Sequence, residues 1–241
     1  MSQIIIVGRG SAQAAALGGD PHFASVVLLS GFEGTDGSTT FDDESASNHA
    51  LTAVGNAQID TAQFKFGASS ALLDGTGDRI TAPNHANWWF DAGNFTIETF
   101  VRFASVAASQ AFCSFYDSSP SAEKSWWFGR LNTNVMRFYY SLDGSTDVFF
   151  DTAWTPSTNT WYHVAAVRDG TTLRMFVDGT ELATQAIGAS DSLFNSNQPL
   201  TIGMVDGGFG LNGWLDEMRI TKGVARYTAN FTPPSEAFPR S

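Results

Sequence analysis

The chain has 241 residues, of which 43% are hydrophobic and 15% are charged, a composition that excludes disorder as its main state and allows a sizeable core. Its 24 acidic and 13 basic side chains give a formal net charge of −11, which argues against nucleic acid as a partner because phosphates repel an acidic chain. No apolar run approaches the roughly 20 residues of a membrane-spanning helix, so we expect no insertion into a membrane.

The first 22 residues differ from the rest of the chain. A short apolar run at residues 4–7 ends at a Gly-Arg-Gly sequence. This run is too short for the core of a signal peptide, and no basic residue precedes it, so we expect no signal peptide. The segment also holds too few apolar residues to fold alone. We therefore predict an N-terminal arm over residues 1–22, suited to attachment, and one folded domain over residues 23–241.

From residue 23 onward, short β-prone runs alternate with turn sequences. Residues 26–29 form a continuous apolar run, which is typical of a strand covered on both faces. Residues 95–103 alternate in polarity, as expected of a strand with two different faces. One face carries Phe95, Ile97, Val101 and Phe103, and the other carries Thr96, Glu98 and Arg102.

Turn signals complete the pattern. An Asp-Gly pair at residues 178–179, between two β-prone runs, predicts a hairpin, and similar pairs lie at residues 143–144 and 169–170. Only residues 86–89 and 224–227 are candidates for short helices. The Thr-Pro-Pro sequence at residues 232–234 predicts an irregular strap across the surface, because proline cannot donate to a sheet. About a dozen short strands predict an all-β sandwich or barrel.

Seven short stretches carry the motifs of one family. They are residues 28–41 (LLSGFEGTDGSTTF), 66–67 (FG), 73–78 (LDGTGD), 94–98 (NFTIE), 161–165 (WYHVA), 176–179 (FVDG) and 212–227 (NGWLDEMRITKGVARY). In this order the chain resembles, over about residues 23–239, the laminin G-like, concanavalin A-like modules often found in bacteriophage virion proteins. The resemblance implies an antiparallel two-sheet β-sandwich of the jelly-roll type.

The resemblance also implies a function and a location. It indicates a non-enzymatic structural or accessory protein on the surface of a bacteriophage particle, as a head decoration or as part of a tail or fibre. On this interpretation, residues 1–22 attach the domain to other virion proteins, since an extended segment can add to an exposed sheet edge. Self-association into a homo-oligomer is left open.

Asp216 is the candidate metal ligand with the strongest argument. Simple alternation places it on one face with Trp214, Met218 and Ile220, and a buried carboxylate is costly unless it has a partner. The family resemblance suggests a structural calcium ion between this strand and the first one. The acidic residues near the first strand are Glu33, Asp36, Asp42 and Asp43, of which we select Glu33, Asp36 and Asp43 together with Asp216. The alternative is that Asp216 pairs with a lysine or arginine, or caps a turn.

No strand of the sequence supplies the two carboxylates that glycoside hydrolysis requires. The best single candidate is Glu98, but its same-face neighbours are Thr96, Phe100 and Arg102, so we interpret Glu98 and Arg102 as a charge pair. Asp216 and Glu217 are consecutive and should point to opposite faces. We therefore predict no catalytic residue, and a glycanase is the least favoured function.

Adjacent tryptophans are the candidate ligand contacts. Trp126 and Trp127 follow a predicted loop at residues 118–125, and sugars often stack on exposed indole rings. One ring of such a pair usually faces the core, so at most one should be free. We name Trp126 and Trp127 as candidate glycan-binding residues. A stand-alone lectin-like module is accordingly the main alternative to a virion component, and both roles can coexist.

Overall fold

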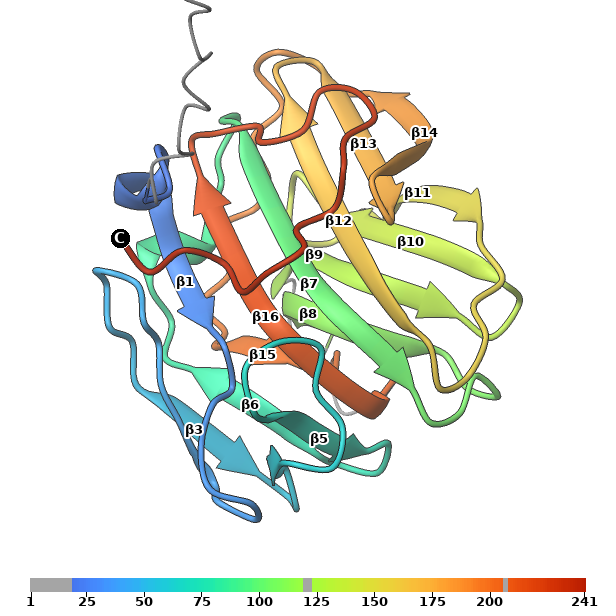
Figure 1. The fold of residues 1–241 in the computed structure, drawn as a ribbon. Coiled ribbons are helices and arrows are strands. Elements are labelled where there is room, and N and C mark those ends of the chain that lie inside the picture. Colours follow the sequence, from blue (N-terminus) through green and yellow to red (C-terminus); the bar gives the residue numbers. More distant parts are fainter. Residues whose placement is uncertain (1–18, 119–122, 206–207) are drawn as a thin grey trace, which may run out of the picture.

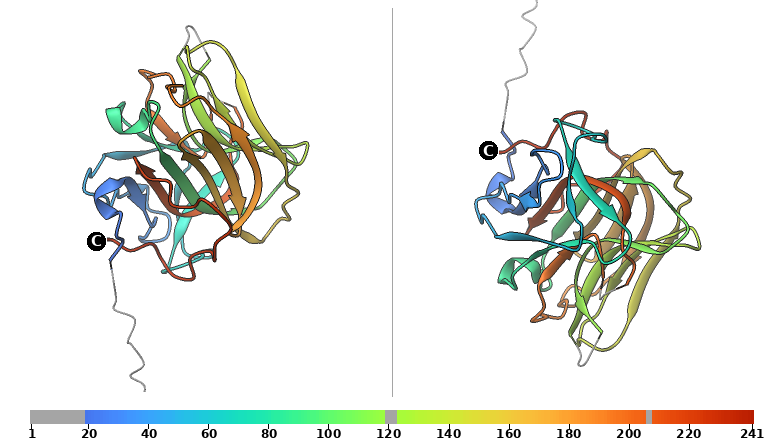
Figure 2. Two further views of the ribbon diagram at one scale, coloured as in Figure 1. Left: turned by 90° about the horizontal axis from the view of Figure 1, so that it is seen from above. Right: turned by 90° about the horizontal axis from the view of Figure 1, so that it is seen from below.

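Alternating side chains and tight turns divide the described part of the chain into sixteen strands and two short 3-10 helices. The computed structural model describes residues 19–118, 123–205 and 208–241. The strands form two antiparallel sheets that pack face to face (Figures 1 and 2). This architecture confirms the predicted all-β sandwich.

Sheet A has the strand order β14–β13–β12–β7–β16–β5–β4, and β1 pairs with β16 beside this path. Its strands are β1 (Val26–Ser30), β4 (Gln58–Asp60), β5 (Ser70–Asp74), β7 (Phe95–Phe103), β12 (Trp161–Asp169), β13 (Thr172–Val177), β14 (Thr180–Ala186) and β16 (Asn212–Lys222). Sheet B has the order β11–β10–β9–β8–β15–β6–β3–β2. Its strands are β2 (Thr40–Phe41), β3 (Leu51–Val54), β6 (Arg79–Ala82), β8 (Gln110–Asp117), β9 (Glu123–Leu131), β10 (Val135–Tyr140), β11 (Val148–Ala153) and β15 (Leu200–Ile202).

The turns and short helices follow the sequence signals in part. Asp178 and Gly179, with φ of 47° and 75°, form the predicted two-residue turn between β13 and β14. The 3-10 helix η2 (Ala86–Trp88) lies at one predicted helical site, and η1 (Phe23–Ser25) precedes β1. The helix predicted at residues 224–227 was wrong, because the backbone there docks on β7 through a bond from Arg226 N to Thr96 Oγ1 of 3.0 Å. In the described ranges, no helix is long and apolar enough to cross a membrane.

Strand β7 shows why sheet A sits at the centre of the molecule. Phe95, Ile97, Val101 and Phe103 enter the core between the sheets, as their alternation predicted. The opposite face of β7 is also buried at Thr96, Glu98 and Phe100, whereas Arg102 alone in this strand is half-buried. A third layer of chain therefore covers most of the outer face of sheet A.

That third layer is the C-terminal strap, which we define as residues 223–241. Figure 1 shows it crossing β12, β7 and β16 without forming a strand, as the Thr-Pro-Pro sequence predicted. Tyr227 and Phe231 stack 3.6 Å apart and pack against Ala165, Val167 and Phe176. Phe238 packs against Phe100 in a separate buried cluster.

A β-bulge in β16 overturns the simple alternation predicted for this strand. The register against β7 shifts between Asp216 and Arg219, and Glu217 adopts a positive φ of 52°. Leu215 and Met218 consequently both enter the core. Asp216 instead lies opposite Phe100 on the outer face of sheet A, so its predicted position beside Met218 and Ile220 was wrong.

Under the strap lies a buried network of charged side chains centred on Glu98. Its carboxylate contacts Arg219 at 2.9 Å, His163 Nε2 at 3.0 Å and the Tyr227 hydroxyl at 2.7 Å. The charge pair predicted between Glu98 and Arg102 was therefore wrong. The spacing of four residues separates them along one strand, whereas Arg219 lies directly across from Glu98 on β16.

The same network holds the start of the described chain. Asp20 accepts bonds from Arg226 at 2.6 Å and from Arg219 at 3.2 Å, and its backbone N–H donates to Ser241 at 2.7 Å. Residues 19–22 thus belong to the sandwich, next to the C-terminus (Figure 2). The remainder of the predicted arm, residues 1–18, lies outside the described residues.

The network generates a prediction for stability. Glu98→Gln removes the negative charge that compensates Arg219, and breaking a buried ion pair from one side costs about 3 kcal/mol or more of unfolding free energy. Urea denaturation should show this loss. Glu181→Gln is the matched control, because the pair of Glu181 with Arg174 is partly exposed and should contribute less than about 1 kcal/mol. Equal losses in the two variants would contradict the central role of Glu98.

The pH dependence of stability offers a second test. Burial alone would raise the Glu98 pKa, but Arg219 and His163 outweigh burial and hold this pKa at about 2, below its ordinary value of 4.5. The folded-state pKa is depressed, so this stabilisation is present above pH 4.5 and is lost as the pH falls toward 2. The stability gap between wild type and Glu98→Gln should therefore shrink between pH 5 and pH 3 in urea titrations. A gap that stays constant over this range would contradict it.

Candidate functional site

The two adjacent tryptophans of β9 point to opposite faces of sheet B. Trp126 is fully buried between the sheets and donates from Nε1 to the Trp88 carbonyl at 2.8 Å. Because Trp126 is fully buried, it cannot stack on a ligand, and the prediction that it binds one was wrong. Trp127 lies on the outer face, as expected for one ring of the pair, although it is only 4% exposed.

Trp127 is the floor of an aromatic cluster on the outer face of sheet B. It lies directly across from Tyr139 on β10, with nearly parallel rings whose centroids are 6.2 Å apart. Phe209, from the loop before β16, covers it edge-on at 5.7 Å and is itself 42% exposed. Phe149 on the edge strand β11 continues the cluster at 5.7 Å from Tyr139 and is 46% exposed. The cluster thus offers exposed rings above a buried aromatic base.

Polar side chains fix the base of this cluster. The Tyr139 hydroxyl donates to Asp147 at 2.7 Å, and Lys124 binds the same carboxylate oxygen at 2.7 Å. Arg137 forms a two-pronged pair with Asp151, at 2.7 and 2.6 Å, and its guanidinium lies 4.1 Å from the centre of the Phe149 ring. These bonds hold the rings in place before any ligand arrives.

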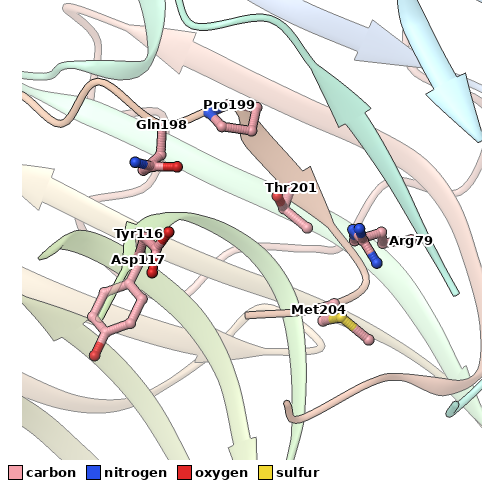
Figure 3. A pocket seen from close by; sticks show the side chains of 7 residues that line it. All are labelled: Arg79, Tyr116, Asp117, Gln198, Pro199, Thr201 and Met204. Atoms are coloured by element: carbon pink, nitrogen blue, oxygen red, sulfur yellow. The ribbon is translucent and has the colours of Figure 1, made fainter. Parts of the chain in front are cut away.

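Two adjoining hollows open on this face and share Tyr116. The aromatic hollow has a volume of about 240 Å³ and is lined by Tyr116, Trp127, Val205, Gly208 and Phe209. The polar hollow has a volume of about 200 Å³ and is lined by Arg79, Tyr116, Asp117, Gln198, Pro199, Thr201 and Met204. Figure 3 shows the side chains of the polar hollow gathered from β6, β8 and the segment around β15.

The chemistry of the two hollows suits binding rather than bond cleavage. Aromatic surface and directional polar groups lie side by side, the combination that sugar-binding sites use. Among the described lining residues, Asp117 is the one carboxylate, whereas glycoside hydrolysis uses two across the scissile bond. Glu98, the best catalytic candidate in the sequence, is fully buried on the other sheet and cannot reach a substrate.

The four predicted calcium ligands do not converge on one point. Asp43 accepts bonds from the backbone N–H groups of Leu29, Ser45 and His49, and Asp36 accepts from Thr61. Within the described ranges, no three acidic, histidine or cysteine side chains are grouped so that they could hold a metal ion. Asp36 and Asp43 therefore act here as hydrogen-bond acceptors: Asp43 holds its own turn and ties it to β1, and Asp36 ties its loop to Thr61.

Asp216 and Glu33 bind the same loop, at residues 65–68. Asp216 Oδ2 accepts from Lys65 N at 2.6 Å and Phe66 N at 3.0 Å, and Glu33 accepts from Ala68 N at 3.1 Å. The Oδ2 atom of Asp216 therefore has the alternative role predicted for this residue, which is to cap a turn. Its other oxygen, Oδ1, is buried without a hydrogen-bond partner among the described residues. This orphaned oxygen is available to a cation. Of the two carboxylates whose charges act on Asp216, Glu217 is bound to Arg240, which leaves Glu33 as the second candidate ligand.

Burial perturbs Asp216 strongly. Loss of solvation, together with the charges of Glu217 and Glu33, raises its pKa from 3.8 to about 7, despite the two backbone N–H groups that bind it. In the absence of a cation, the carboxyl group is thus partly protonated at neutral pH. A bound cation would favour its ionised form instead.

Sequence reasoning missed most residues that line the hollows. Arg79, Tyr116, Gln198 and Phe209 come from four separate segments, and only the sheet order brings them together. One local signal was present: Phe209 is an aromatic residue between Gly208 and Gly210 in a loop, where no core position accounts for it.

Comparisons with solved structures show the same fold in receptor-binding proteins. The binding domain of Paraclostridial Mosquitocidal Protein 1 matches with a TM-score of 0.64 and 16% identity, over 84% of this chain and 50% of that one. The receptor binding domain of botulinum neurotoxin C/D mosaic serotype matches with a TM-score of 0.63 and 15% identity, over 84% of this chain and 49% of that one. A structure of botulinum neurotoxin type C, whose cell entry depends on two ganglioside molecules, matches with a TM-score of 0.60 and 14% identity over the same shares.

This chain therefore corresponds to about half the length of these structures. At such low identity the likeness establishes the fold alone. No curated protein gives a significant match. The family comparison is more specific, because one family profile matches residues 74–226, well over half of the chain. The chain belongs to this family, which is described as the concanavalin A-like lectin/glucanases superfamily.

Proposed function

We propose that the chain is a non-enzymatic carbohydrate-binding module whose ligand occupies the two hollows on the outer face of sheet B. The observation that carries the proposal is the exposed Phe209 ring above Trp127, beside the polar groups of Arg79 and Gln198. A sugar ring can stack on the aromatic wall while its hydroxyl groups bond to the polar wall. The single carboxylate in the described lining supports binding over hydrolysis.

The matched structures support a ligand of this kind at the level of chemistry. One of them is named for gangliosides, which are sugar-bearing lipids, and another for a complex with rat synaptotagmin II. Placement on a bacteriophage particle, through contacts of the N-terminal arm with other virion proteins, remains a proposal that rests on the resemblance in the sequence. In that setting the module would adhere to sugars of the host surface.

A glycan array tests the proposed site. Phe209→Ala should lower binding by about two- to tenfold, because stacking on an aromatic ring contributes about 0.5–1.5 kcal/mol. The variant should fold, since Phe209 is 42% exposed. Leu142→Ala is the matched control, as Leu142 is 41% exposed and lies outside both hollows. Wild-type protein that binds no glycan, or Phe209→Ala that binds as wild type does, would contradict the proposal.

We also propose that a structural calcium ion binds at Asp216 with Glu33, supported by the orphaned Oδ1 oxygen. Without metal, the raised Asp216 pKa contributes stability that is present below pH 3.8 and is lost as the pH rises through about 7. Thermal melts at pH 8 should therefore fall when chelator replaces calcium in wild type. In Asp216→Asn, which keeps an acceptor for Lys65 N and Phe66 N, the two melts should coincide. Wild-type melts that are identical with calcium and with chelator would contradict the proposed calcium site.

A further inference from the structure

A second aromatic surface lies on the opposite side of the molecule, on the outer face of sheet A. Trp161 on β12 is the cross-strand partner of Arg102 on β7, which in turn is the partner of Trp214 on β16. Residues directly opposite each other in a sheet point to the same face. We call these three side chains the tryptophan–arginine row.

The C-terminal strap covers most of the outer face of sheet A, but it does not cover the tryptophan–arginine row. The next rows along the strands contain Phe100 and Glu98, and the C-terminal strap buries both through Phe238 and Tyr227. Figure 1 shows the strap crossing the middle of β12, β7 and β16, away from the end of β7 that carries Arg102. All three side chains of the row are accordingly half-buried rather than covered.

Arg102 has no polar partner among the residues that the structure describes. Its guanidinium lies 4.8 Å from the centre of the Trp214 ring, and this is its one side-chain interaction with a described residue. Every other arginine in the described ranges donates at least one hydrogen bond to the protein. A cation left without a carboxylate is unexpected in a chain with 24 acidic side chains.

A second cation lies close to the row. The Lys65 ammonium is 5.4 Å from the Phe66 ring centre and 5.5 Å from that of Phe100, and it too has no hydrogen bond or ion pair with a described residue. Phe100 and Arg102 are two residues apart on the same face of β7, so Lys65 lies above the neighbouring row. The Arg102 and Lys65 side chains are thus two cations on this face that form no ion pair with a described carboxylate, although Asp60 and Asp216 lie nearby.

The remaining contacts fix the row in place. Trp214 Nε1 donates to Asp60 Oδ2 at 2.6 Å, which sets the orientation of the indole, and Trp161 packs against the cluster around Phe100. The Arg102 guanidinium lies over the Trp214 ring and makes no hydrogen bond with a described residue, so its N–H groups are available to donate two parallel bonds to a carboxylate.

From this geometry we infer that the tryptophan–arginine row binds a sugar that carries a carboxylate. The acid group bonds to Arg102, with Lys65 adding favourable charge, and the sugar ring lies against the flanking indoles. Sialic acids and uronic acids share this chemistry. The inference goes beyond the proposed function, because it needs neither hollow of sheet B and adds a second site on the opposite face.

Isothermal titration calorimetry with the purified full chain tests the inference. The probes are 3′-sialyllactose, trigalacturonate, neutral lactose and a hexaglutamate peptide. Wild type should bind 3′-sialyllactose or trigalacturonate more tightly than lactose, and the acid that binds identifies the class of sugar. Arg102→Gln, which removes the charge but keeps the stem, should abolish this preference with at least a tenfold loss of affinity. Trp161→Ala should also weaken binding of the acidic sugar.

Matched variants separate this site from the hollows. Arg79→Gln removes the cation of the polar hollow and should leave the preference for acidic sugars intact. Thermal melts of Arg102→Gln should stay close to those of wild type, because Arg102 is half-buried and loses only its contact with the Trp214 ring. The inference is overturned if Arg79→Gln abolishes the preference while Arg102→Gln keeps it, and that result leaves the proposed function standing. Tighter binding of hexaglutamate than of either acidic sugar, or equal binding of lactose and the acidic sugars, would also overturn it.

Discussion

The buried ion pair of Glu98 with Arg219 is the constraint on which the rest of sheet A depends. Removing both charges from water is costly, so each must be enclosed by partners on every side. Those partners are His163 from β12, Tyr227 from the C-terminal strap and Asp20 from the start of the described chain. The pair therefore recruits both ends of the domain onto the outer face of the sheet. This third layer turns a two-layer sandwich into a molecule with one covered face and one open face.

How far the sequence could predict this arrangement depends on the range of the interactions. The alternation in β7 is local, and it correctly assigned Phe95, Ile97, Val101 and Phe103 to the core. The partner of Glu98 could not be read in the same way, because Arg219 is 121 residues away in the chain. The bulge in β16 likewise has a non-local context, since β5 pairs with the first part of this strand and β1 with the last part, on the same side. Glu217, with its positive φ, occupies the change from one neighbour to the other.

The candidate site on sheet B could also be predicted from the sequence only in part. The sequence indicated that one of Trp126 and Trp127 would face outward, and pairing of β9 with β10 then places Tyr139 beside Trp127. The hollow itself depends on Phe209, which the loop before β16 folds over Trp127. Residue types and strand periodicity therefore predict the floor of such a site, whereas loops set its walls. The same reasoning explains why Arg102, assigned to Glu98 from its spacing, instead lies on Trp214.

The two surfaces lie on the outer faces of different sheets, and this geometry has a consequence for binding. Packed sheets are about 10 Å apart, and outward side chains add to that separation, so one sugar ring cannot contact both surfaces. A module that uses both would bind two glycans, or two branches of one large glycan that wraps around the edge of the sandwich. Binding of the second branch would then be intramolecular, and weak individual sites would give a much higher combined affinity. The buried charge network determines which part of sheet A a ligand can reach. It holds the strap over Glu98, and the strap leaves Arg102 half-buried at the end of β7.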